Sequence, residues 1–261
     1  MDIRTLGKDL RVSALGLGCM GFSHACGAPT EKGEAIRALV ASLGMGYTFF
    51  DTAECYGPYE NEALVGEAFA HCRDKVVIAT KFGVTHAPDR SLLLDSRSET
   101  IRRSVEGSLK RLKTDHIDLY YQHRIDPKVP PEEVAETMAA LIREGKITHW
   151  GISEANEEYL RRAHAVCPVT AIQNRYSMMY RDYEKLFPVL EELRIGFVAF
   201  SPLANGVLTG AYSRDSAFEK GTDYRADMPQ FQPRRAARSV TPIHILCSGR
   251  WSSADCPRRS P

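Results

Sequence analysis

The sequence predicts an α/β fold of the (β/α)8 barrel type that is incomplete, lacking its eighth strand and C-terminal helix. Short apolar runs alternate with helical patterns throughout residues 1–231, which is typical of parallel strands covered by helices. Seven such runs with at least six intervening helices are evenly spaced, as in a barrel. An eighth unit should follow residue 231, where the composition changes abruptly.

The expected elements follow in chain order. Residues 3–12 favour a hairpin that precedes the first barrel strand. Strands are expected within residues 14–20, 47–51, 76–80, 117–121, 147–152, 171–174 and 196–200. Helices are expected at residues 30–43, 61–70, 98–112, 131–143, 156–166 and 183–193. Thr30 is the predicted N-cap of the first helix and Gly44 its stop signal.

A doubly wound sheet would fit the same alternation of strands and helices. Gly16, Gly18 and Gly21 match the spacing of the dinucleotide fingerprint of such a sheet. Two of these glycines fall inside an apolar run, however, and about ten residues separate Gly21 from the next expected helix. A phosphate would therefore not meet a helix N-terminus directly, and we interpret the match as accidental.

Composition narrows the class of protein. The net charge of +1 gives no reason to expect nucleic acid or an anionic membrane as a partner. The sequence contains no apolar run long enough to span a bilayer and no apolar segment of a signal peptide, so we expect a cytoplasmic protein. Seven scattered cysteines without C-x-x-C spacing predict reduced thiols and no metal site.

The composition divides the chain at residue 231. Residues 232–261 contain six Arg, four Pro and five Ser, but no Lys or Glu. We expect residues 1–231 to form the barrel and residues 232–261 to be an unrelated, disordered tail, because the tail has little apolar surface to bury. Out-of-frame translation of a GC-rich gene would give this composition. Reading the DNA beyond the codon of Phe231 in all three frames tests that hypothesis.

Polar residues follow the expected strands at the end where barrel enzymes place their chemistry. Asp51 ends the second strand with Tyr56 five residues later, Lys81 ends the third strand, and His123 ends the fourth. A carbonyl that accepts a hydride needs a proton donor within reach. Tyr56 could serve if the Lys81 ammonium lowers its pKa and Asp51 keeps that lysine charged. His123 could then orient the carbonyl oxygen.

Several motifs resemble those of the aldo-keto reductase family, in order and at the family spacing. They are Asp51-Thr-Ala-Glu-Cys-Tyr56-Gly57 with Asn61-Glu62, Thr80-Lys81-Phe82-Gly83, the run ending in Tyr121-Gln122-His123, Trp150-Gly151-Ile152-Ser153, Gln173-Asn174-Arg175-Tyr176-Ser177 and Phe200-Ser201-Pro202-Leu203. The resemblance extends from about residue 3 to about residue 231. It implies a nicotinamide-dependent reductase of small carbonyl compounds.

The resemblance also implies roles for individual residues. Tyr56 would be the general acid–base, tuned by Lys81 and Asp51, with His123 orienting the carbonyl. The implied cofactor is NADP(H), with NAD(H) as an alternative. Its nicotinamide and pyrophosphate would be contacted by Ser153, Gln173, Phe200, Ser201 and Leu203, with Cys19 and Met20 at the junction of cofactor and substrate.

The sequence departs from the family at two places. Glu154 stands where the family often has Asn, and the basic segment that grips the 2′-phosphate of NADP has no counterpart after residue 231. Three interpretations therefore remain: a carbonyl reductase, a truncated barrel without turnover, and a cofactor-sensing or partner-binding relative.

Overall fold

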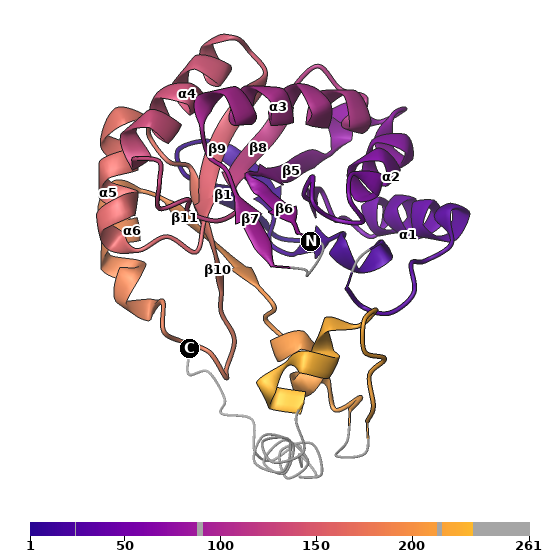
Figure 1. The fold of residues 1–261 in the computed structure, drawn as a ribbon. Helices are drawn as coiled ribbons and strands as arrows, with labels where there is room; N and C mark the ends of the chain where they lie inside the picture. The colour runs from indigo at the N-terminus through magenta and orange to yellow at the C-terminus, as the bar shows by residue number, and fades with distance from the viewer. Residues whose placement is uncertain (24, 88–90, 213–215, 232–261) are drawn as a thin grey trace, which may run out of the picture.

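A computed structural model describes residues 1–23, 25–87, 91–212 and 216–231, and these contain one seven-stranded parallel sheet (Figure 1). In sheet order the strands are β11 (Gly196–Phe200), β10 (Ala171–Arg175), β9 (Ile147–Ser153), β8 (Ile117–Gln122), β5 (Val77–Phe82), β4 (Phe49–Asp51) and β3 (Gly16–Gly18). Each strand pairs in parallel with its neighbour. Because all these pairings are parallel, the carboxyl ends of the strands share one edge.

In the described part of the chain, six α-helices connect these strands and lie on the outside of the sheet (Figure 1). They are α1 (Lys32–Gly44), α2 (Glu60–Phe69), α3 (Ser98–Leu112), α4 (Pro131–Arg143), α5 (Glu157–Val166) and α6 (Phe187–Leu193). The alternation expected from the sequence is therefore confirmed, and α3 and α4 have the expected bounds. The expected cap of α1 was wrong: the Glu31 carboxylate, rather than Thr30, accepts hydrogen bonds from Gly33 N and Glu34 N.

The two faces of the sheet bury different sets of side chains. Phe50, Ile78 and Tyr120 point outward and pack with apolar residues of the helices in the larger core. Phe49 and Leu119 point into the barrel interior. Strands that are buried on both faces read as nearly continuous apolar runs, which is why the sequence indicated them clearly.

An N-terminal hairpin closes the barrel interior at the amino ends of the strands. It consists of β1 (Ile3–Leu6) and β2 (Leu10–Ser13), paired antiparallel as the sequence predicted. Its apolar side chains, including Leu6 and Val12, are buried against the inward-facing residues of the sheet. The barrel interior is therefore filled at the amino ends of the strands in the described residues.

A second hairpin was not predicted. It consists of β6 (Val84–His86) and β7 (Leu92–Leu94), which pair antiparallel directly after β5. Three residues each form these strands, too few to give a period in the sequence. The hairpin places Val84, His86 and Leu92 at the carboxyl ends of the barrel strands.

Within the described residues, β3 and β11 are the end strands of the sheet. A closed eight-stranded barrel would pair both of them with one further strand. The segment 232–261, expected to be a disordered tail, lies outside the described residues.

Gly16 and Gly18 lie within β3, and α1 begins only at Lys32. Within the described residues the glycine motif leads into the short 3-10 helix Met20–Phe22 and not into the N-terminus of an α-helix, in agreement with the interpretation that its spacing is accidental. The helices of the described part are all too short or too polar to cross a membrane.

Gly66 provides a test of helix packing. A Cβ atom at this position in α2 would lie 2.5 Å from Arg111 O and 2.6 Å from Leu112 Cα of α3. Rigid backbone cannot yield as a side chain can, so Gly66→Ala should lower the free energy of unfolding by about 1–3 kcal/mol. Gly44→Ala is the matched control, because a Cβ there meets nothing within 4 Å. Equal urea-denaturation midpoints for both variants would contradict the close approach of α2 and α3.

Candidate active site

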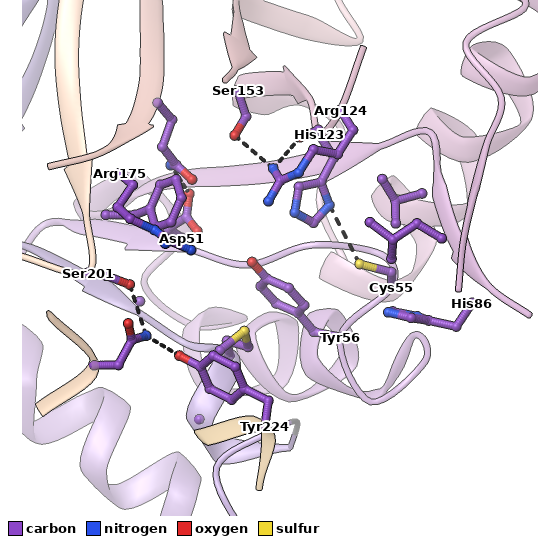
Figure 2. A pocket seen from close by; sticks show the side chains of 18 of the residues that line it. Asp51, Cys55, Tyr56, His86, His123, Arg124, Ser153, Arg175, Ser201 and Tyr224 are labelled. Carbon is purple, nitrogen blue, oxygen red and sulfur yellow. Dashed lines mark hydrogen bonds between the residues drawn. The ribbon is translucent and has the colours of Figure 1, made fainter. Parts of the chain in front are cut away.

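A cavity of about 410 Å³ opens at the carboxyl ends of the barrel strands. Its wall combines side chains from strand ends, from the β6–β7 hairpin and from the segment after β11 (Figure 2). Of the predicted site residues, those that line it are Met20, Asp51, Tyr56, His123, Ser153, Gln173, Phe200 and Ser201. Residues far apart in the chain, such as Met20 and Ser201, thus meet at one edge of the sheet.

A buried ion pair joins the ends of two neighbouring strands beneath this cavity. Lys81 of β5 is 1% exposed, and its Nζ donates hydrogen bonds to Asp51 Oδ1 and, at 2.8 Å, to Thr52 O. The other oxygen of Asp51 accepts a hydrogen bond of 2.8 Å from Gln173 Nε2. Burial, the largest single effect, lowers the pKa of Lys81, but the charge and hydrogen bond of Asp51 together with those of Tyr56 outweigh it and raise that pKa to about 12. The lysine is therefore cationic at neutral pH.

Tyr56 stands in the loop between β4 and α2, with its hydroxyl pointing into the cavity (Figure 2). Lys81 Nζ lies 3.4 Å from Tyr56 Oη, so the predicted contact is present. The predicted net effect on the pKa was wrong. Burial raises the pKa of Tyr56 above its ordinary value, and the opposing effect of the Lys81 charge is smaller. Tyr56 is thus a protonated phenol at neutral pH, which suits a proton donor.

His123 follows the end of β8 and is buried beside Tyr56. The two rings meet edge to face, with centroids 5.8 Å apart. On the other side of the imidazole, Cys55 Sγ lies 3.6 Å from His123 Nδ1. Asp51, Tyr56, Lys81 and His123 therefore form one cluster, as the sequence predicted, and Cys55 adjoins it.

A buried amide holds the loop that carries Tyr56. Asn61, at the start of α2, accepts a hydrogen bond of 2.6 Å from Thr52 Oγ1 and donates one of 2.9 Å to Cys19 O. These bonds tie the loop to the end of β3 on one side and to the end of β4 on the other. Fixing both ends of a short loop limits the positions that Tyr56 can take.

Two predicted cofactor residues lie away from the cavity wall. The side chain of Cys19 is completely buried in the helix-facing core, because the chain turns at the end of β3 and directs Met20 to the cavity instead. Leu203 is 54% exposed and lies in the loop beyond Ser201. The prediction that the Cys19 side chain lines the site was wrong, and Leu203 could contribute only through its backbone.

Glu154, the departure from the family pattern, forms an ion pair that the sequence did not suggest. Its carboxylate lies 3.4 Å from Arg124 Nε, and Arg124 Nη1 donates a hydrogen bond of 3.1 Å to Ser153 Oγ. Glu154 adopts a left-handed backbone conformation with φ of 57°. Its side chain thus restrains Arg124, which lines the cavity directly after His123.

The prediction also missed Arg175, whose guanidinium lies 5.9 Å from the centroid of the Phe200 ring. Its Nε is buried and makes no hydrogen bond within the described residues. The sequence held a signal for it, because Arg175 follows Gln173 by two positions and therefore points to the same face of β10. Tyr224 and Met228, which also line the cavity, come from a remote segment and gave no such signal.

The comparison with known families decides the classification of the chain. The model of the Aldo/keto reductase family matches residues 14–244. The chain belongs to this family. The barrel expected from the sequence is thereby identified as the aldo-keto reductase type, and the matched range includes every predicted site residue. Residues 232–244 of the match lie outside the described residues.

Known relatives agree with this assignment. The chain is 43% identical over 205 residues to a probable aldo-keto reductase 1 of Glycine max, and the match covers 78% of this chain. It spans about three fifths, 59%, of the length of that relative.

Solved structures give the same result. A glycerol dehydrogenase of Gluconobacter oxydans has a TM-score of 0.84 at 31% identity, covering 94% of this chain and 76% of its own. A holo-form aldo-keto reductase of Bacillus halodurans has a TM-score of 0.73 at 32% identity, and the match covers 86% of this chain and 72% of that structure's chain. An aldo/keto reductase of Klebsiella pneumoniae, solved with NADP and acetate, has a TM-score of 0.66 at 32% identity, and the match covers 79% of this chain and 69% of that structure's chain.

The ion pair predicts a pH-dependent stability. A pKa of Lys81 raised from 10.5 in the unfolded chain to about 12 in the folded chain contributes about 2 kcal/mol to the free energy of unfolding. This contribution is fully present below the unfolded pKa and is lost as the pH rises through the folded pKa. Lys81→Met should therefore be less stable than the wild type at neutral pH, and the gap should narrow above about pH 10.5. Lys75→Met, at an exposed position, is the control. A gap for Lys81→Met that stays constant in urea titrations up to about pH 12 would contradict the pairing.

Proposed function

We propose that this protein is an NADP-dependent oxidoreductase that reduces an aldehyde or ketone to an alcohol, with NAD as the alternative cofactor. The observation that carries the proposal is the Tyr56 hydroxyl inside the cavity, 3.4 Å from a buried, cationic Lys81. A protonated phenol beside a fixed ammonium is suited to give a proton to an oxygen that gains negative charge.

Each member of the cluster has a separate task in this mechanism. Bound NADPH supplies the hydride. Tyr56 donates its proton to the carbonyl oxygen, and Lys81 stabilises the phenolate that remains. His123 donates a hydrogen bond to the same oxygen and fixes its orientation. Asp51 acts through Lys81, which it keeps charged and in place.

The cavity wall next to this cluster fits a nicotinamide cofactor. Arg175 Nε is a buried donor without a partner among the described residues, and it lies over the Phe200 ring. A bound ligand with acceptor oxygens could pair with the Arg175 guanidinium, which lines the cavity, whereas an apolar ligand would leave that charge unpaired. Ser153, Gln173 and Ser201 add polar groups to the same wall. We assign these five residues to the cofactor, with Met20 at its junction with the substrate and Leu203 in the adjoining loop.

The remaining wall favours a small carbonyl substrate. Val84 and Leu92 from the β6–β7 hairpin give an apolar surface in the same cavity, where Val84 packs beside Cys55 and Tyr56, and His86 adds a polar group. The similarity to a glycerol dehydrogenase supports a small oxygenated substrate.

The first test uses the purified chain with NADPH and a generic aldehyde. We expect saturable NADPH binding in a fluorescence titration and oxidation of NADPH on addition of the aldehyde. Tyr56→Phe removes only the hydroxyl, so it should keep NADPH binding while turnover falls about 10²–10⁴-fold. Tyr59→Phe is the matched control, because Tyr59 is exposed and lies outside the cavity wall.

Three results would separate the alternatives in this test. Turnover that depends on Tyr56 supports the reductase. A stable NADPH complex without turnover supports a cofactor-sensing relative. Absence of binding at millimolar NADPH supports a truncated barrel that is not an enzyme.

Arg175 allows a test of the cofactor wall alone. Arg175→Met should raise the Kd for NADPH at least about 10-fold, because a charge-assisted hydrogen bond contributes about 1.5–3 kcal/mol. Arg181→Met is the control, since Arg181 is exposed and pairs with Glu184 rather than lining the cavity. Equal Kd values for wild type and Arg175→Met would assign Arg175 no part in holding the cofactor.

A further inference from the structure

The thiol of Cys55 contacts the histidine of the catalytic cluster. Cys55 precedes Tyr56 in the loop after β4, whereas His123 follows β8, so the contact joins two separate segments of the site. Cys55 Sγ lies 3.6 Å from His123 Nδ1, within the range of a hydrogen bond that involves sulfur. Cys55 is 5% exposed and His123 is 8% exposed, so water competes little for either group.

The chemistry of the two groups decides which one donates. Burial raises the pKa of the Cys55 thiol to about 12, so the sulfur carries its proton at neutral pH. The contact could be made as S–H···Nδ1 or as Nδ1–H···S, because a thiol is both a weak donor and a weak acceptor. We take the first arrangement, in which the stronger acceptor of the two atoms, the unprotonated imidazole nitrogen, receives the hydrogen bond. The favoured arrangement is therefore a Cys55 S–H that donates to His123 Nδ1.

An Nδ1 that accepts this bond has no proton of its own. A neutral imidazole carries one N–H, which must then be on Nε2. Figure 2 shows the Cys55 sulfur on one side of the His123 ring, and the opposite edge of the ring turned toward the side of the Tyr56 hydroxyl. The Nε2–H group thus faces the space in which the carbonyl oxygen would be held.

We propose that Cys55 is a positioning residue that holds His123 in the Nε2–H tautomer, so that the imidazole can donate a hydrogen bond to the substrate carbonyl. This role rests on the proposed reductase function. The opposite tautomer would direct a lone pair at the carbonyl oxygen, which repels it. A residue that selects one tautomer therefore decides whether His123 assists or opposes carbonyl binding.

The tautomer can be measured without turnover or cofactor. In the full chain labelled with ¹⁵N-histidine, two-bond and three-bond ¹H–¹⁵N correlations distinguish a protonated ring nitrogen from an unprotonated one. The spectrum is recorded at about pH 8, above the ordinary imidazole pKa of about 6.5. The signals of His123 are assigned by their absence in His123→Gln.

Two variants separate the hydrogen bond from packing. Cys55→Ser keeps a donor at the same position, whereas Cys55→Ala removes it. We expect the Nε2–H tautomer in wild type and Cys55→Ser, and a mixture of tautomers in Cys55→Ala. Cys167→Ala is the matched control, because Cys167 is also 5% exposed but lies at the end of α5, outside the cavity wall.

Kinetics provide the second measurement. Cys55→Ala should lower kcat about 10- to 100-fold, the range for residues that orient a functional histidine, and Cys55→Ser should restore most of it. An Nδ1–H tautomer in the wild type, or unchanged His123 signals in Cys55→Ala, would overturn the proposal even if the protein is an active reductase. If Cys55→Ala does not fold, the proposal is still tested by the tautomer of His123 in the wild type and in Cys55→Ser, both of which should be Nε2–H. Absence of turnover would reject the reductase function and leave the tautomer result valid.

Discussion

The buried contact between Lys81 and Asp51 is the constraint on which the rest of the site depends. An ammonium that is 1% exposed must be paired, because an isolated charge in such a place costs several kcal/mol. The carboxylate that pairs with it comes from the end of the neighbouring strand β4, and the carbonyl of Thr52 adds a second acceptor. The pair therefore fixes the ends of β4 and β5 relative to each other at the carboxyl edge of the sheet. It also sets where Tyr56 must lie to meet the lysine.

Removing one partner of a buried ion pair is destabilising, but replacing both partners by apolar residues of similar volume is often neutral, so stability alone does not explain why the pair is present. Its presence is better explained by what it does to Tyr56. Burial makes the phenol harder to ionise, and the nearby ammonium partly offsets that effect. Most of the buried apolar surface of the barrel lies elsewhere, in the helix-facing core and under the hairpin that closes the amino ends of the strands.

The loops around the cavity carry backbone strain that the surrounding contacts maintain. Glu154 after β9, and Ser201 and Asn205 after β11, all have positive φ although none is glycine. Such conformations cost of order 1–3 kcal/mol each and persist where neighbouring groups hold them. Glu154 is held by Arg124, and Asn205 donates a hydrogen bond to Tyr224 in the segment that crosses the cavity. The strain is concentrated beside the strands that supply the cavity wall.

The sequence by itself determined the alternation of strands and helices, the family, and the grouping of Asp51, Tyr56, Lys81 and His123. Periodicity and apolar runs are local properties, and in a parallel sheet every carboxyl end lies at the same edge, so strand ends could be read directly. The β6–β7 hairpin was not predicted, because its strands are too short to show an alternation of apolar and polar residues.

Only the tertiary structure decided which side chains face the cavity and what their partners are. Cys19 turned out to be buried in the core, while Arg124 and Arg175 line the cavity. The direction of the Tyr56 pKa depends on burial, which the spacing of charged residues does not reveal. Likewise, the contact of Cys55 with His123 joins residues 68 positions apart. Contacts of that range follow from how strands are placed beside one another, and no local pattern in the chain encodes them.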